Sequence, residues 1–167
     1  MKHKIKFQTK PPPKYGKVVF QTKLASQLSL KNPVIEKMIS ILNENKLIEK
    51  NEDVWVRLCL DEIITNSIKH GNKNQSNKYV SITLYIKQNL WAAKIEDEGK
   101  GFTEDNLFDI TSKEYLNLEH GRGILLIQNY MDEVYFYNNG SSIQIMRKKK
   151  NLLQKIWSKF LDFFYQI

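Results

Sequence analysis

The sequence LCLDEIITNSIKHGN, residues 58–72, has the pattern of a helix with two different faces. Apolar side chains recur along one arc at helical spacing, which predicts burial against a core. Glu62, Asn66 and His70 are four residues apart, so they stack on a neighbouring strip of the same surface. An acid, an amide and an imidazole beside a core face form either a solvated strip or the floor of a binding site. The buried arc is predicted to contain Val56, Leu60, Ile63, Ile64, Ser67 and Ile68.

The wider sequence is that of an ordinary globular chain whose charge is concentrated at its two ends. Its 167 residues suffice for one domain with a buried core. The formal net charge is +8, yet both ends are rich in lysine and the region between them is slightly acidic. A folded nucleic-acid-binding domain needs a basic face. No direct DNA binding is therefore expected.

The cysteine content and the apolar segments indicate where such a chain resides. Cys59 is the only cysteine, so no internal disulfide can form and a reducing compartment is favoured. The N-terminus is rich in lysine and proline and lacks the apolar core of a secretory signal. No uncharged apolar stretch is long enough to cross a bilayer. We expect a cytoplasmic protein, with peripheral contact at the inner membrane face as the alternative that the C-terminus raises.

The chain divides into three parts. Residues 1–17 form a basic arm, in which a run of three prolines favours extended, unpacked chain. Residues 18–148 contain the strand and helix patterns and are predicted to form a single domain. Residues 149–167 have apolar and polar side chains on opposite halves of a helical wheel, which predicts an amphipathic helix.

Within residues 18–148, the order of the patterns predicts an α+β fold. The first helix is expected over Lys31–Ile48, with Asn32 as its N-cap and Pro33 as its first helical residue. The polar segment 98–120 has the length of a functional loop. Strand, helix, helix, two strands, helix and two strands give a two-layer sandwich, an antiparallel or mixed sheet with helices on one face. The other expected elements are the strands Val18–Leu24, Tyr79–Lys87, Trp91–Glu96, Val134–Tyr137 and Ser142–Met146 and the helix Gly123–Met131.

Three short segments carry side chains that suit a nucleotide. Asn66 offers a neutral carbonyl oxygen for a Mg²⁺ ion whose other ligands are phosphate oxygens and water. Glu62, one helical turn away, has a carboxylate that can accept a proton from a hydroxyl group or water. Asp97 follows a strand and offers an acceptor for an exocyclic amine such as that of adenine. The three segments are residues 62–66, 97–102 and 121–124.

Glycines in the second and third segments allow the backbone to approach such a ligand. Gly99 and Gly101 let the chain pass close to a flat base. Gly121 and Gly123 precede a predicted helix, whose free N–H groups bind anions, and Arg122 adds a positive charge for a phosphate. Each signal alone is common in turns and at helix ends. Their joint order and spacing indicate a nucleotide site.

This combination resembles the GHKL superfamily of ATPases, which have the Bergerat nucleotide fold. The three segments match its N-box, its first glycine box and its second glycine box. The phrases LDEIITNSIKHG, KIEDEGKGF and GRGILLIQNYMDEVYF look like the anti-sigma-factor serine/threonine kinases of bacterial partner-switching systems. The resemblance covers about residues 18–148.

The resemblance implies ATP and Mg²⁺ as cofactors and suggests a role for each residue. Glu62 would be the catalytic base, Asn66 the Mg²⁺ ligand and Asp97 the residue that reads adenine. Residues 103–120 would be the lid over the phosphates. The implied cofactor-binding set is Asn66, Asp97, Gly99, Gly101, Phe102, Gly121, Arg122, Gly123 and Ile124, the last in place of the more usual leucine.

The implied function is that of an ATP-binding anti-sigma factor which is also a serine/threonine kinase. Its partners would be a sigma factor and an anti-anti-sigma protein of the STAS type, which accepts the phosphate. A second hypothesis is a nucleotide-gated protein-binding regulator without phosphotransfer. His70 stays outside the catalytic set, because a histidine near a helix C-terminus is favourable there for local reasons.

Three roles are open for residues 149–167. The segment packs on its own domain or in a homodimer contact, it lies on an anionic membrane surface, or it fills a groove of a partner. Aromatic residues beside a Lys/Arg cluster favour the membrane surface. The apolar half of the wheel consists of Leu152, Leu153, Ile156, Trp157, Phe160, Leu161, Phe163 and Phe164.

Overall fold

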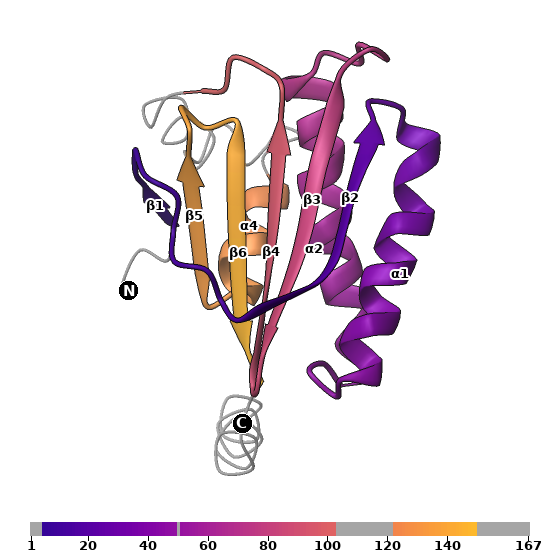
Figure 1. Cartoon of the computed structure of the whole chain (residues 1–167), viewed down its shortest axis with the longest axis vertical. Coiled ribbons are helices and arrows are strands. Elements are labelled where there is room, and N and C mark those ends of the chain that lie inside the picture. The colour runs from indigo at the N-terminus through magenta and orange to yellow at the C-terminus, as the bar shows by residue number, and fades with distance from the viewer. Residues whose placement is uncertain (1–4, 50, 103–121, 150–167) are drawn as a thin grey trace, which may run out of the picture.

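The structure, a computed structural model, describes residues 5–49, 51–102 and 122–149. These residues form a sheet with α-helices packed on it (Figure 1). The strands are β1 (Ile5–Phe7), β2 (Lys17–Ala25), β3 (Tyr79–Lys87), β4 (Leu90–Asp97), β5 (Glu133–Tyr137) and β6 (Ser142–Lys148). The helices are α1 (Lys31–Glu44), α2 (Asp53–Asn66) and α4 (Arg122–Tyr130), with the short helical turns η1 (Leu28–Leu30) and η2 (Ser67–Gly71).

The sheet is mixed, with the strand order β1-β5-β6-β4-β3-β2. β1 is parallel to β5, and each of the other neighbouring pairs is antiparallel. The two hairpins predicted from the sequence, β3 with β4 and β5 with β6, are confirmed. The turn of the second hairpin requires left-handed backbone, with φ of 51° at Asn138, 53° at Asn139 and 81° at Gly140. Asparagine and glycine are the residues that adopt this conformation at least cost.

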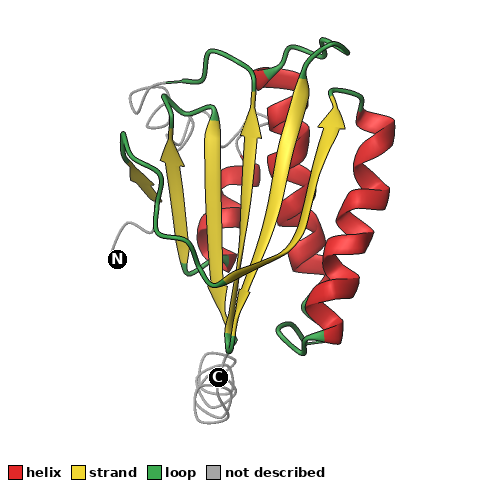
Figure 2. Ribbon diagram, viewed as in Figure 1, coloured by secondary structure: helices red, strands yellow, loops and turns green. Residues whose placement is uncertain are grey.

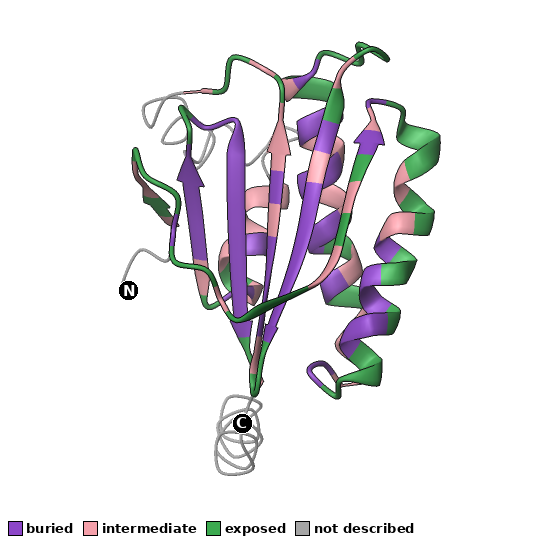
Figure 3. Cartoon of the chain, viewed as in Figure 1, coloured by how far each residue is buried: buried purple, intermediate pink, exposed green. Residues whose placement is uncertain are grey.

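The fold has two layers, with the helices on one face of the sheet (Figure 2). α2 is amphipathic, and its Leu60 and Ile64, together with Ile68 of η2, are fully buried in one core cluster with strand residues such as Ile82 and Ile95. Figure 3 shows the buried residues along the strands β3 to β6 and on parts of α1 and α2, whereas β1 and β2 at the sheet edges are more exposed. The predicted α+β two-layer sandwich is confirmed, with α2 burying its apolar side against the sheet.

The first helix begins at the predicted residue, Lys31, but it differs from the prediction in its N-cap and in its end. α1 begins at Lys31 after the turn η1, and Leu30 rather than Asn32 is its N-cap. It ends at Glu44, four residues before the predicted end, because Lys46 adopts a left-handed φ of 54°. The prediction of Asn32 as the cap is wrong. The short turn η1 already directs the chain into the helix, so a side-chain cap is not used there.

The N-terminal arm also differs from the prediction of extended, unpacked chain. Ile5–Phe7 form β1 and pair with β5, so the prediction is wrong for this segment. The chain then crosses the helix-free face of the sheet on its way to β2 (Figure 1). There Gln144 Nε2 donates to the Pro13 carbonyl over 3.1 Å, and the Tyr15 hydroxyl donates to Glu133. Strand pairing and these bonds anchor the arm to the sheet. The proline run alone does not predict this anchoring.

The predicted boundaries of the central domain, residues 18 and 148, stay predictions. The amphipathic segment 149–167 lies outside the described residues apart from Lys149, whose N–H bonds to the Asn89 carbonyl over 2.7 Å. Within the described part of the chain, no helix is both long and apolar enough to span a membrane.

Candidate nucleotide site

Helix α2 carries the first two predicted site residues on one strip of its surface. Asn66 Nδ2 donates a hydrogen bond of 2.8 Å to Glu62 Oε1, as residues one turn apart can do. Both residues are half-buried. The bond engages the amide nitrogen of Asn66, so its carbonyl oxygen remains the atom suited to a hard cation. Glu62 keeps its second carboxylate oxygen for another partner.

The start of α4 lies directly against Glu62. A Cβ built on Gly123 would lie less than 3.0 Å from the Glu62 side chain, closer than real Cβ atoms approach other atoms. A larger residue at Gly123 would therefore displace the Glu62 carboxylate or the start of α4. The structure thus brings the second glycine segment to the helix that carries Glu62 and Asn66.

Asp97, at the end of β4, lies beside the turn that follows Asn66. Its carboxylate accepts hydrogen bonds from the Ser67 hydroxyl and from the Gly99 N–H, the latter over 2.9 Å. Ser67 follows Asn66 directly in the chain. The carboxamide predicted to bind Mg²⁺ and the carboxylate predicted to read adenine therefore belong to one region of the molecule.

The environment of Asp97 makes its carboxylate a strong acceptor. Burial raises the pKa of Asp97 above its ordinary value, because a low-dielectric surrounding disfavours the charged form. The bonds from Gly99 and Ser67 favour the charged form and offset part of that rise, and Lys78 adds the weakest of these effects. A donor entering the site would stabilise the charge further, since hydrogen bonds to ionised groups are the strong ones.

The end of α2 is wider than a regular helical turn. The chain continues as η2, a π-helical turn, in which the Asn72 N–H bonds to the Ser67 carbonyl five residues earlier over 2.8 Å. Such turns are frequent at functional sites. Because the spacing changes here, the four-residue strip of Glu62 and Asn66 does not continue to His70, which is exposed.

Gly71 is a contact residue that the sequence marks only as a helix end. A Cβ at Gly71 would lie less than 3.0 Å from the Asp97 carboxylate, and one at Gly99 equally close to the Gly71 carbonyl. The end of η2 and the segment 97–99 therefore approach each other at positions without side chains. A glycine after a helix is the usual C-terminal signal, so nothing local in the sequence distinguishes this contact from an ordinary helix end.

The end of the second segment packs against the β5–β6 turn. Gly101 has a left-handed φ of 73°, and the Phe102 N–H bonds to the Asn139 carbonyl over 2.8 Å. The Phe102 ring meets those of Phe7 and Phe136 edge-on, with centroids 5.6 Å and 5.1 Å apart. Phe102 thus packs in an aromatic cluster at the margin of the core, and its predicted contact with nucleotide stays a prediction.

The remaining predicted residues are described only in part. Ile124 packs against the core as a half-buried residue of α4. Arg122 is the first residue of α4, but its side chain lies outside the described part. Gly121 and the predicted lid, residues 103–120, also lie outside it.

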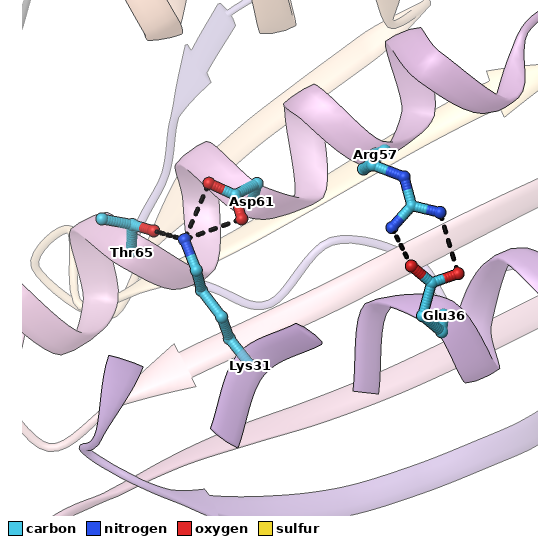
Figure 4. A network of polar contacts seen from close by, with 5 residues as sticks. All are labelled: Lys31, Glu36, Arg57, Asp61 and Thr65. Carbon is cyan, nitrogen blue, oxygen red and sulfur yellow. Dashed lines mark hydrogen bonds and ion pairs between the residues drawn. The ribbon is translucent and has the colours of Figure 1, made fainter. Parts of the chain in front are cut away.

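A polar clamp between α1 and α2, which the sequence did not reveal, holds α2 in its orientation (Figure 4). Lys31 Nζ donates to Asp61 Oδ2 and to Thr65 Oγ1, each over 2.8 Å. Arg57 forms two bonds with the carboxylate of Glu36. Asp61 and Thr65 each precede a predicted site residue directly, so the clamp fixes the rotation of the strip that carries the site.

The donor set suits a metal that receives most of its ligands from a nucleotide. Among the described residues, no group of three or more His, Cys, Asp or Glu side chains is arranged to hold a metal ion. The carbonyl oxygen of Asn66 is a hard ligand of the kind that Mg²⁺ accepts, and Mg²⁺ commonly binds through one or two protein groups plus phosphates and water.

Comparison with known proteins identifies the family. The sequence model for the family described as "Histidine kinase-like ATPase domain" matches residues 30–148, well over half of the chain. The chain belongs to this family. Its matched region contains Glu62, Asn66, Asp97 and Gly123, the residues that the fold brings together. An ATPase domain also supports ATP as the ligand.

Curated relatives indicate the subgroup within this family. The anti-sigma F factor of Anoxybacillus flavithermus is 30% identical over 100 residues, which cover 55% of this chain and 66% of that protein. The anti-sigma F factor of Clostridium perfringens is 32% identical over 103 residues, covering 58% and 71%. Serine-protein kinase RsbW of Listeria monocytogenes serovar 1/2a is 26% identical over 103 residues, covering 58% and 65%.

These relatives are named as anti-sigma F factors and as a serine-protein kinase, the two descriptions that the resemblance of the sequence motifs implies, and the chain is related to them. The matches to the Anoxybacillus and Listeria proteins span just under two thirds of the length of those proteins.

Proposed function

We propose that this chain binds Mg-ATP, holds a sigma factor inactive and phosphorylates a serine or threonine of an anti-anti-sigma partner. The family match supports ATP binding, and the names of the relatives support the regulatory and kinase parts. The observation that carries the proposal is that Glu62, bonded to Asn66, lies against Gly123, while the Asp97 carboxylate lies beside η2, the turn that follows α2.

In this proposal Glu62 is the catalytic base. Its Oε1 is held by the Asn66 amide, so its other oxygen is available to accept the proton of the acceptor hydroxyl. The hydroxyl oxygen forms a bond to the γ-phosphorus, and the bond from that phosphorus to the bridging oxygen breaks, so that ADP leaves. Asn66 would hold Mg²⁺ through its carbonyl oxygen, and the bound ion would neutralise charge on the phosphates.

Asp97 would bind the other end of the nucleotide. Its carboxylate would accept a hydrogen bond from the exocyclic amine of adenine, a donor that guanine and hypoxanthine lack at that position. Gly71 and Gly99 lie so close to this carboxylate that a Cβ at either position would meet it. The proposal therefore assigns recognition of the base to Asp97 at the end of β4 and the phosphotransfer chemistry to Glu62 and Asn66 on α2.

The Glu62→Gln variant tests the kinase part. Glutamine preserves the size of the side chain and an acceptor for the Asn66 amide, but it does not take up the proton. We expect ATP affinity, measured by calorimetric titration with Mg²⁺, to be unchanged. Phosphorylation of a STAS-type protein from the same organism, followed with labelled ATP, should fall by about a hundredfold or more. Glu44→Gln, at the exposed end of α1, is the matched control and should change neither.

The outcomes separate the two hypotheses for this site. If the wild-type chain binds no ATP, the proposal fails as a whole. If it binds ATP and the Glu62→Gln variant still exchanges partners and phosphorylates them as before, Glu62 is not the base. If ATP controls partner binding and neither the wild type nor the Glu62→Gln variant phosphorylates the partner, the chain is a nucleotide-gated regulator without phosphotransfer.

For residues 149–167 we propose contact with an anionic membrane surface. The support is the sequence pattern alone, an apolar and aromatic half-wheel after the basic run at residues 147–150. Full-length protein should sediment with phosphatidylglycerol-containing vesicles, and a chain ending at residue 148 should not. If removal of the segment instead leaves vesicle binding unchanged and converts a dimer to a monomer, it is a homodimer contact.

A further inference from the structure

Asn72 is a fully buried polar residue with no role in the chemistry proposed above. Its Oδ1 accepts a hydrogen bond of 2.7 Å from the N–H of Glu98. Its Nδ2 donates to Ser26 Oγ over 2.7 Å and to the Tyr79 carbonyl over 2.9 Å. One carboxamide thus uses both its acceptor and its donor group in the protein interior, where such bonds are strong and costly to leave unmade.

The partners of Asn72 come from separate parts of the chain. Ser26 follows β2, Tyr79 begins β3, and Glu98 follows β4. Glu98 stands between Asp97, the proposed adenine-reading residue, and Gly99, whose N–H bonds to the Asp97 carboxylate. The side chain of Asn72 is therefore attached to the backbone at the centre of the segment that presents Asp97.

The backbone of Asn72 gives no reason for an asparagine. Its φ is −81°, which any residue adopts, whereas the following Lys73 and Asn74 have left-handed values of 57°. Its backbone N–H closes the π-helical turn by bonding to Ser67, and its side chain takes no part in that bond. The carboxamide is thus used for the contacts with the β2, β3 and β4 segments and not for ending the helix.

We propose that Asn72 is a positioning residue for adenine recognition. By holding the Glu98 N–H against the end of η2, it fixes the depth and rotation of the segment 97–99 and so the direction of the Asp97 carboxylate. The inference rests on the proposed function, in which the Asp97 carboxylate accepts a hydrogen bond from the exocyclic amine of adenine. Asn72 itself contacts neither base nor phosphate in this account.

A second tie on the same segment is weaker. The Glu98 carboxylate accepts the N–H of Tyr79 over 3.0 Å, but this bond is exposed to water. Water competes for exposed hydrogen bonds and competes less for those of Asn72, because its bond to Ser26 is buried and its other two bonds are partly buried. Loss of Asn72 would leave the segment attached mainly through its ends and its exposed tie.

The test compares two variants of the full-length protein that remove different parts of the network. Asn72→Ala removes the bond to Glu98 and both donated bonds. Ser26→Ala, the matched control, removes a single donated bond and leaves the Glu98 contact in place. The readout is the ratio of the dissociation constants for ITP and ATP, because hypoxanthine lacks the exocyclic amine. A charge-assisted hydrogen bond predicts a ratio of about tenfold or more in the wild type.

We expect Asn72→Ala to lower this ratio to about two and Ser26→Ala to leave it near the wild-type value, since tenfold corresponds to one strong hydrogen bond. A merely structural role of Asn72 would lower the melting temperature of both variants and leave the ratio intact, which would overturn the proposal. If Asn72→Ala does not fold, Asn72→Ser, whose hydroxyl is too short to bond all three partners, takes its place with the same expected and contrary results.

Amide hydrogen exchange separates this inference from the proposed function. In nucleotide-free protein, the Glu98 N–H should exchange at least about tenfold faster in Asn72→Ala than in Ser26→Ala, because only the first variant frees that amide. Equal rates would overturn the proposal. If the wild-type chain binds neither ATP nor ITP, the proposed function fails, and the exchange rates still decide whether Asn72 holds the segment.

Discussion

Two partly buried carboxylates at opposite ends of α2 meet opposite electrostatic environments. Glu52, the N-cap residue of α2, pays for burial but receives bonds from Arg147 and from the Glu49 N–H, so its pKa is held below the ordinary value. Asp97, beside the far end of the same helix, is also buried, and there burial outweighs its hydrogen bonds, so its pKa is raised. One carboxylate is neutralised by the protein itself, whereas the other lacks an equivalent compensation.

At the Glu52 end, an ion pair between Arg147 of β6 and Glu52 joins the sheet to the start of α2. Arg147 is 9% exposed, donates to Glu52 Oε1 over 2.6 Å and to the Tyr130 carbonyl, and lies 3.7 Å from the centroid of the Tyr130 ring. A cleft of about 450 Å³ opens beside this group, with Trp55 in its wall. Arg147 already donates to Glu52 and to the Tyr130 carbonyl, so its charge at this cleft serves the fold.

The Asp97 end shows the opposite arrangement. Polar groups there are brought together by glycines at the contact points, and Gly71, Gly99 and Gly123 leave no side chain between the segments. None of the proposed nucleotide residues lines the cleft at the Glu52 end. The comparison teaches that the residues suited to chemistry are recognised by unsatisfied charge and close backbone approach, and not by the presence of a cleft.

The largest effect on stability is expected from Arg147→Ala. Removing one partner of a mostly buried ion pair leaves Glu52 uncompensated, which should lower the free energy of unfolding by about 3 kcal/mol. ATP affinity, measured well below the melting temperature, should stay unchanged, because Arg147 acts at the other end of α2. Arg57→Ala breaks an exposed pair with Glu36 and is the control with a much smaller loss. A marked loss of ATP affinity in Arg147→Ala would show that the two ends are coupled.

A smaller effect, and one confined to binding, is expected from Gly71→Ala. The added methyl group would occupy space now filled by the Asp97 carboxylate. That carboxylate must turn away, so ATP affinity should fall by about tenfold or more, which is 1.4 kcal/mol. Calorimetric titration measures the affinity and thermal unfolding the stability. Lys69→Ala, an exposed residue of the same turn, should change neither. If Gly71→Ala binds ATP as tightly as the wild type, Asp97 is not part of the nucleotide site.

The sequence predicts well those parts of the molecule that depend on local periodicity. The buried arc of α2 and the alternation of β3 are strong repeats, and both elements form as expected. The prediction of Asn32 as the N-cap of α1 is wrong because the turn η1 precedes the helix and replaces the side-chain cap. β1 was missed because its three residues carry little pattern and receive their partner from β5, far along the chain.

The candidate site was predictable only where its residues form motifs. Glu62, Asn66 and Asp97 stand in recognisable segments, and the fold brings them near each other. Gly71 and Asn72 look like an ordinary helix end in the sequence. Their contacts with the segment after β4 arise only when the sheet places that segment against η2, so no local pattern could reveal them.

The smallest effect expected is a gain of stability in Asp97→Asn at neutral pH. Because the pKa of Asp97 is higher in the folded protein than its ordinary 3.8, ionising this group costs folding free energy. That cost is absent below pH 3.8 and is complete once the pH exceeds the folded pKa. The melting temperature of Asp97→Asn should therefore exceed that of the wild type at pH 7, and the gain should shrink as the pH falls towards 3.8, while adenine preference is lost.

Glu52→Gln supplies the opposite sign and completes the comparison between the two ends. Since the pKa of Glu52 is lowered from its ordinary 4.5, its ionised form stabilises the fold above pH 4.5, and that stabilisation is lost as the pH falls through the folded pKa. Glu52→Gln should therefore melt below the wild type at pH 7 and approach it in acid. If Asp97→Asn and Glu52→Gln both lose stability at pH 7, the protein compensates the charge of Asp97 as fully as that of Glu52. The proposed nucleotide end then carries no unsatisfied charge.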